Sequence, residues 1–88
     1  MTRKRVDSNQ EEIVKALRNI GAHVQSLASV GKGCPDLLVS YRGKWYVMEI
    51  KDGAGSLTNA EAKWFADARA TAWIVRTPWR ALQVIGAV

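Results

Sequence analysis

The sequence has little of what several protein classes require. Its 88 residues include one cysteine, Cys34, which excludes an internal disulfide and a cysteine-based zinc site. No apolar run approaches the roughly 18 residues of a membrane span, and the first residues lack a signal peptide's apolar segment. The composition, 48 % apolar and 24 % charged, is that of a globular chain and not of a disordered one. We therefore expect a single cytoplasmic domain, residues 1–88.

Negative charge is also scarce in this chain. Thirteen Lys and Arg against eight Asp and Glu give a net charge of +5, and Arg3, Lys4 and Arg5 supply three of the positive charges. A basic protein with a basic arm, residues 1–7, suits a polyanion, of which nucleic acid is the commonest. A solubilising tail explains the arm equally well, so the charge alone does not identify a function.

Helix signals occur in three places. Ser8 or Asn9 can cap a first helix, which carries apolar residues at helical spacing and stops at a glycine. Thr58 and Glu61 have the spacing of a capping box at the start of a second helix. Pro78 suits the first turn of a third. The predicted helices span residues 10–21, 58–70 and a segment that begins at 77–78.

Strand signals fill the segments between these helices. Residues 36–41 and 44–51 are strongly strand-like, and because only Arg42-Gly43 separates them they predict an antiparallel hairpin. Alternation and apolar composition indicate two further strands, residues 22–28 and 72–76. The resulting order, α-β-β-β-α-β-α, predicts an α/β fold of the α+β kind, a mixed sheet with helices packed on it.

The hairpin brings two carboxylates together. With a two-residue turn, Asp36 faces Glu49 on the neighbouring strand, and Lys51 lies two residues further on the same face. Opposed carboxylates repel each other unless a positive group lies between them. A divalent cation such as Mg²⁺, which takes carboxylate oxygens, resolves the conflict. An edge hairpin with a surface Lys–Glu pair is the alternative, and a three-residue loop would move these residues to opposite faces.

The motif residues point to a known family. The stretch Gly33-Cys34-Pro35-Asp36-Leu37-Leu38-Val39, followed by Met48-Glu49-Ile50-Lys51, resembles the G-x-P-D-L-x-V … E-[IV]-K signature of the VRR-NUC (virus-type replication-repair nuclease) family. That family belongs to the PD-(D/E)XK nuclease superfamily, so the resemblance implies a restriction-endonuclease-like core over nearly the whole chain. The chain looks like the small stand-alone members found in phages and prophages, which implies a bacterial host cell.

The resemblance also implies roles for individual residues. Asp36 and Glu49 match the carboxylates that hold Mg²⁺ or Mn²⁺, the carbonyl of Ile50 matches a backbone ligand, and Lys51 matches the catalytic lysine. A residue of the first helix often completes such a site. Glu12 and Gln10 are the candidates, and since two residues are about 200° apart on a helix, at most one of them can face the metal. We prefer Glu12 for its charge.

Other residues have competing explanations. Glu61 is either a helix cap or an accessory site residue, and Trp45 is either a core residue or a ring on which a base stacks. Trp64, Trp73 and Trp79 fall on apolar positions, which favours the core or a subunit interface. We interpret Cys34 as a packing residue and find no metal partner for His23. The residues expected to contact nucleic acid are Lys32, Arg42, Lys44, Arg3, Lys4 and Arg5.

These observations lead to one main hypothesis and one alternative. The main hypothesis is a Mg²⁺- or Mn²⁺-dependent deoxyribonuclease, with Asp36, Glu49 and Lys51 as its catalytic residues. The resemblance implies selectivity for branched or junction DNA, and a homodimer would enlarge the small core and offer two active sites. The alternative is a non-catalytic nucleic-acid-binding protein that keeps the nuclease fold.

Overall fold

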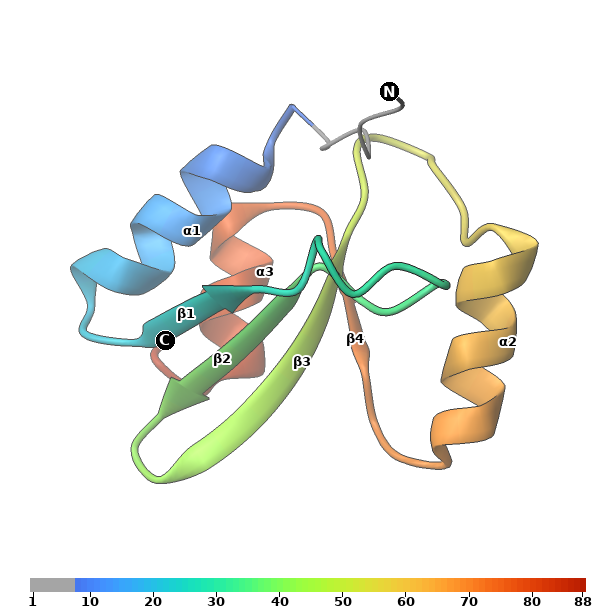
Figure 1. Cartoon of the computed structure of the whole chain (residues 1–88). Helices are drawn as coiled ribbons and strands as arrows, with labels where there is room; N and C mark the ends of the chain where they lie inside the picture. Colours follow the sequence, from blue (N-terminus) through green and yellow to red (C-terminus); the bar gives the residue numbers. More distant parts are fainter. Residues whose placement is uncertain (1–7) are drawn as a thin grey trace.

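The computed structural model describes residues 8–88 (Figure 1). The basic arm, with Arg3, Lys4 and Arg5, lies outside the described residues. The elements are α1 (Gln10–Asn19), β1 (His23–Ser26), β2 (Leu37–Tyr41), β3 (Lys44–Ile50), α2 (Asn59–Ala68), β4 (Trp73–Val75) and α3 (Pro78–Val84). The predicted order is therefore confirmed, and each of the six elements before α3 is one to three residues shorter in total than the sequence suggested.

The four strands form one mixed sheet in the order β1-β2-β3-β4. The pairs β1–β2 and β2–β3 are antiparallel, whereas β3 and β4 are parallel. Parallel neighbours cannot be joined by a tight turn, so the chain crosses from β3 to β4 through α2. The described chain is thus an α+β unit with a mixed sheet and three helices, as the sequence predicted.

One face of the sheet is covered by α1 and α3, which lie together on that side (Figure 1). Ile13 and Leu17 of α1 and Ala81 of α3 are fully buried there. They pack on the strand residues that point to this face. The core cluster consists of Ile13, Leu17, Ala22, Val24, Leu37, Val39, Met48, Ile50, Val75, Ala81 and Ile85. Burial of these side chains is the main source of stability in a chain of this length.

The opposite face of the sheet, which we call the open face, is less covered. Alternate residues of β3 point to it, and their exposure falls along the strand from Trp45, 66 % exposed, through half-buried Val47 to Glu49, 2 % exposed. The helix α2 stands beside β4 (Figure 1) and buries none of its apolar side chains completely. Among residues 8–88, other elements therefore enclose the open face only at its Glu49 end.

Two tryptophan interpretations need correction. Trp45 is not a core residue, because it lies on the open face near the hairpin turn. Trp79, the second residue of α3, is 61 % exposed and does not belong to the core either. Trp73 is half-buried against the core, and half-buried Trp64 meets the ring of Phe65 edge to face. Sequence periodicity locates a face of an element but does not show whether another element covers it.

The caps agree in part with the sequence. Thr58 and Glu61 form the predicted capping box at the start of α2. Asn9 is the N-cap residue of α1, but its side chain makes no capping hydrogen bond.

Within residues 8–88, no helix combines the length and the apolar composition that crossing a bilayer requires.

Candidate active site

The hairpin turn sets the register of the site. Arg42 and Gly43 both have positive φ, 50° and 80°, as a two-residue type I′ turn requires. Arginine is unusual at such a position, and its guanidinium lies over the Tyr41 ring at 5.0 Å. The pairing runs from Tyr41 with Lys44 to Leu37 with Met48, as predicted. One further step places Asp36 opposite Glu49.

Asp36 fastens the ends of β2 and β3 to each other. Its backbone N–H donates to the carbonyl of Met48 at 3.0 Å. Its Oδ2 accepts a hydrogen bond from the backbone N–H of Ile50 at 2.7 Å, and the side chain is buried. The carboxylate is therefore held in a fixed position beside Glu49.

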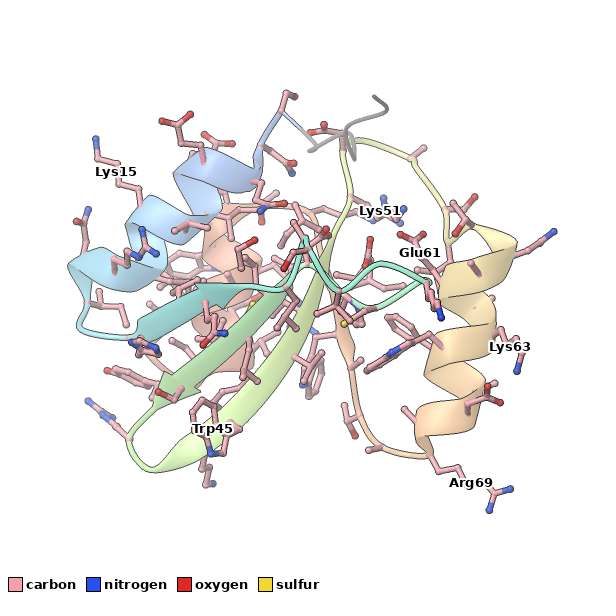
Figure 2. The ribbon with its side chains drawn as sticks, viewed as in Figure 1. Lys15, Trp45, Lys51, Glu61, Lys63 and Arg69 are labelled. Atoms are coloured by element: carbon pink, nitrogen blue, oxygen red, sulfur yellow. The ribbon has the colours of Figure 1, made fainter. Side chains whose placement is uncertain are left out.

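Lys51 joins the two glutamates of the site. Its Nζ lies 2.8 Å from Glu61 Oε1 and 3.5 Å from Glu49 Oε2. Figure 2 shows Lys51, the residue after β3, and Glu61 of α2 pointing toward each other. Glu61 Oε1 also accepts from the backbone N–H of Thr58 at 2.8 Å. Glu61 is thus both a helix cap and a neighbour of the lysine, so the two explanations offered by the sequence are compatible.

The site contains more negative than positive charge. Burial is the largest cause that raises the pKa of Glu49, to about 8, and a hydrogen bond with Glu61 and the charge of Asp36 add to it. Burial also opposes ionisation of Glu61, but hydrogen bonds from Lys51 and Thr58 outweigh it and lower the pKa of Glu61 to about 2. Desolvation likewise disfavours the Lys51 cation, yet the two glutamates raise the pKa of Lys51. The lysine is therefore charged, and Glu49 is the carboxyl that retains its proton at neutral pH.

Gly33 explains how α2 reaches the site. The segment between β1 and β2 extends past the sheet to α2 (Figure 1). Gly33 has φ +80°, and a Cβ there would overlap the carbonyl of Ala60 and lie 2.9 Å from the backbone nitrogen of Glu61. Only glycine permits this approach, which positions Glu61 beside Lys51. The glycine of the sequence motif therefore has a structural role at the first turn of α2.

One oxygen of the site is suited to bind a cation. Glu49 Oε1 is buried and has no hydrogen-bond partner among residues 8–88. A buried acceptor of this kind is costly, and a cation that takes oxygen ligands would satisfy it and offset the charge of Asp36. Within the same residues, no group of three or more His, Cys, Asp or Glu side chains is arranged to hold a metal. A bound ion would need the Ile50 carbonyl, water or substrate oxygens in addition.

The first-helix residues are placed differently from one another. Glu12 is exposed on α1, whereas Gln10 is half-buried and lines a hollow between α1 and the sheet that reaches Leu37. Which of them completes a metal site stays a prediction. The residue of this region that contacts the strand ends is Asn9, which the sequence suggested only as a cap. Its Nδ2 donates to the carbonyls of Lys51 at 3.2 Å and Arg76 at 2.8 Å.

The predicted nucleic-acid contacts do not form one cluster. Lys32, at φ 55°, is exposed and lies with Lys63 on the α2 side of the molecule. Arg42 and Lys44 are exposed at the hairpin turn, the end of β3 opposite to Glu49. Cys34 is buried, in agreement with a packing role. His23 is exposed on β1 and belongs to the hairpin end of the sheet.

Comparison of the chain with models of protein families, with curated proteins and with solved structures gives no match in any of the three. The functional argument therefore starts from the geometry of the site. Asp36, Glu49, Lys51 and Glu61 meet at the edge where β3 ends and α2 begins, although up to 25 residues separate them in the chain.

Proposed function

We propose that this protein is a metal-dependent deoxyribonuclease whose active site consists of Asp36, Glu49 and Lys51. One observation carries the proposal: the buried carboxyl groups of Asp36 and Glu49 lie together beside a charged lysine, and one oxygen of Glu49 is left without a hydrogen-bond partner among residues 8–88. A pair of this kind is costly for stability alone. The chain as a whole is nonetheless basic, with a net charge of +5, which suits a polyanionic substrate.

The residues divide the work by their chemistry. Asp36, Glu49 and the Ile50 carbonyl would hold Mg²⁺ or Mn²⁺, which supplies Lewis-acid activation of the scissile phosphate and of water. Lys51, held by Glu61, offers a fixed positive charge to the phosphate oxygens as negative charge develops on them. Glu61 keeps the lysine in place because its own position is fixed by the start of α2.

The proposal extends to the fold family, the substrate and the oligomeric state. The order α-β-β-β-α-β-α and the parallel pair β3–β4 support a PD-(D/E)XK core of the VRR-NUC type. We further propose that the enzyme acts on branched or junction DNA in the cytoplasm of a bacterial host, as a homodimer. The incomplete burial of apolar side chains on α2 supports association with a second copy.

The direct test is cleavage of a four-way junction, a flap, a plain duplex and a single strand, each with Mg²⁺, Mn²⁺ or EDTA. We expect metal-dependent cleavage by the wild type, none by Asp36→Asn, and cleavage slowed at least about 100-fold by Lys51→Ala. Lys63→Ala is the matched control, since Lys63 is an exposed lysine of α2 whose partner is Asp67. Size-exclusion chromatography with light scattering tests the dimer, which a monomer at micromolar concentration would contradict.

Absence of cleavage with every ion would overturn the nuclease proposal. If the wild type then still bound DNA, and the two variants bound as tightly, the protein would be a non-catalytic DNA-binding protein that retains the acidic cluster for another reason.

A further inference from the structure

The hairpin end of the open face carries a row of residues that the proposed chemistry does not use. The sheet register places His23 opposite Ser40 and Ser40 opposite Trp45, so these residues of β1, β2 and β3 point to the same face. Trp45 is 66 % exposed. A large aromatic ring gains stability from burial, so an exposed ring on a face of the sheet is available for contact with a partner.

The surroundings of the ring favour a polyanion. A hollow of about 340 Å³ lies beside it, lined by Trp45, His23, Ser40 and the hairpin turn. Arg42 and Lys44 supply two positive charges to its rim. None of its lining residues, all in the described part of the chain, is acidic. An aromatic ring flanked by cations matches a nucleotide strand, which presents bases for stacking and phosphates for ion pairing.

Trp45 also stands in a defined relation to the carboxylates. It lies on the same face of the same strand as Glu49, four residues away, which corresponds to about 13 Å. At the 3.4 Å spacing of a stacked strand, about four nucleotides cover that distance, and fewer do so when the bases unstack. Figure 2 shows Trp45 near one end of β3 and Lys51 beyond the other.

We propose that Trp45 is a stacking platform for an unpaired base of DNA, with Arg42 and Lys44 holding the adjacent phosphates. The choice of DNA as the nucleic acid rests on the proposed function. A base inside a duplex offers no free face to a ring, so this subsite recognises a strand that is unpaired about two to four nucleotides from the phosphate at the carboxylates. The unpaired strand is therefore the feature of a branched substrate that this subsite contacts.

The test is the binding of a fluorescein-labelled oligothymidylate and of a blunt duplex of equal length, measured by anisotropy in EDTA. Three variants are compared with the wild type. Trp45→Ala removes the ring, Trp45→Phe keeps an aromatic face, and Trp79→Ala removes a similarly exposed tryptophan on α3. Circular dichroism melting and light scattering verify that each variant is folded and keeps its oligomeric state.

We expect Trp45→Ala to weaken oligothymidylate binding about 5- to 100-fold, the range of one lost base–aromatic stack. Trp45→Phe should stay within about threefold of the wild type, Trp79→Ala should bind equally well, and duplex binding should be less affected by Trp45→Ala. Unchanged oligothymidylate binding by Trp45→Ala would overturn the proposal. An equal loss for the duplex, or a change of oligomeric state in Trp45→Ala, would also overturn it.

The readout does not depend on catalysis. Metal-dependent cleavage without Trp45-dependent binding would overturn the stacking subsite and leave the nuclease proposal intact. Binding that depends on Trp45 in a protein that cleaves no DNA would support the stacking subsite and overturn the nuclease proposal.

Discussion

The two ends of β3 differ in nearly every property although they belong to one strand. Around Glu49 the side chains are buried, and carboxylates outnumber cations. Around Trp45 the side chains are exposed, and the charged residues are basic. At the first end α2 and the segment that carries Gly33 enclose the strand, whereas no helix of residues 8–88 covers the second end on this face.

This difference shows how a small sheet can separate two tasks. Enclosure gives the carboxylates fixed positions and a low-dielectric environment in which charge interactions are strong. Exposure leaves the Trp45 ring and its cations accessible to a large ligand. The strand itself supplies a rigid spacing between the two ends. Substitutions at either end should therefore have different kinds of effect.

Lys51→Ala should have the largest effect and should separate the two ends by kinetics. Removal of the positive charge beside the carboxylates is expected to lower kcat by about 10²- to 10³-fold, as loss of one oriented electrostatic group does elsewhere. Trp45→Ala, by contrast, should raise the DNA concentration at half-maximal rate. Initial rates over a range of junction concentrations measure both. If both variants changed the same kinetic parameter, the two ends of β3 would not have separate tasks.

Gly33→Ala should disturb only the enclosed end. The added Cβ meets the backbone of Ala60, and the positive φ strains any residue with a side chain. We expect a loss of about 3 kcal/mol in the free energy of unfolding, measured by urea denaturation. Gly31→Ala is the matched control: it has φ +70° and no atom within 4 Å of the added Cβ, so it should cost only about 1 kcal/mol. Equal losses would show that the contact with α2 is unimportant.

The stability of the enclosed end should depend on pH through Glu49. Its pKa in the folded protein is about 8, above the ordinary 4.5, so folding favours the protonated form. The stability that follows is complete below pH 4.5 and is lost as the pH rises to 8. Glu61, with a pKa lowered to about 2, acts in the opposite sense and only between pH 4.5 and 2.

In EDTA, we therefore expect the melting temperature of the wild type to fall by roughly 10–20 °C more than that of Glu49→Gln between pH 5 and 8. Excess Mg²⁺ should reduce the fall in the wild type, because a cation replaces the proton. Parallel melting curves for the two proteins would contradict the position of Glu49 described above.

Asn9→Ala should have a smaller effect than the changes at Lys51, Gly33 and Glu49. The side chain holds the carbonyls of Lys51 and Arg76, so its removal is expected to cost about 1 kcal/mol in unfolding free energy. The loss is limited because Asn9 Oδ1 is itself buried without a hydrogen-bond partner within residues 8–88. Ser8→Ala, which removes an exposed hydrogen bond to Asp52, should cost less than half as much by the same urea assay.

The sequence was sufficient for those features that depend on neighbours in the chain. The hairpin register follows from a two-residue turn, and the capping box of Thr58 and Glu61 is a local pattern. Both predictions are confirmed. The nuclease resemblance concerns function and stays a prediction, since neither the fold nor the comparisons test it.

The remaining features depend on parts of the chain that only the fold brings together. Trp45 shares a face of β3 with Val47 and Glu49, a pattern that suits either a covered or an open face. No local signal shows that α1 and α3 occupy the other side of the sheet. Asn9 is a residue type that commonly caps helices, but its side chain donates to the carbonyl of Arg76, which is 67 residues away. Gly33 was visible in the sequence as part of a motif. The backbone of Ala60, which leaves no room for a side chain at position 33, belongs to a later helix.

The turn at Arg42 has a consequence for anyone who would engineer this chain. Asparagine before glycine is the preferred pair for a type I′ turn, so Arg42 occupies a conformation that a smaller residue adopts more easily. Its contact with the Tyr41 ring offsets part of that strain. Arg42→Asn would therefore make a more robust hairpin with a weaker electrostatic field around Trp45. At this turn, thermal tolerance and affinity for an anionic strand would have to be optimised against each other.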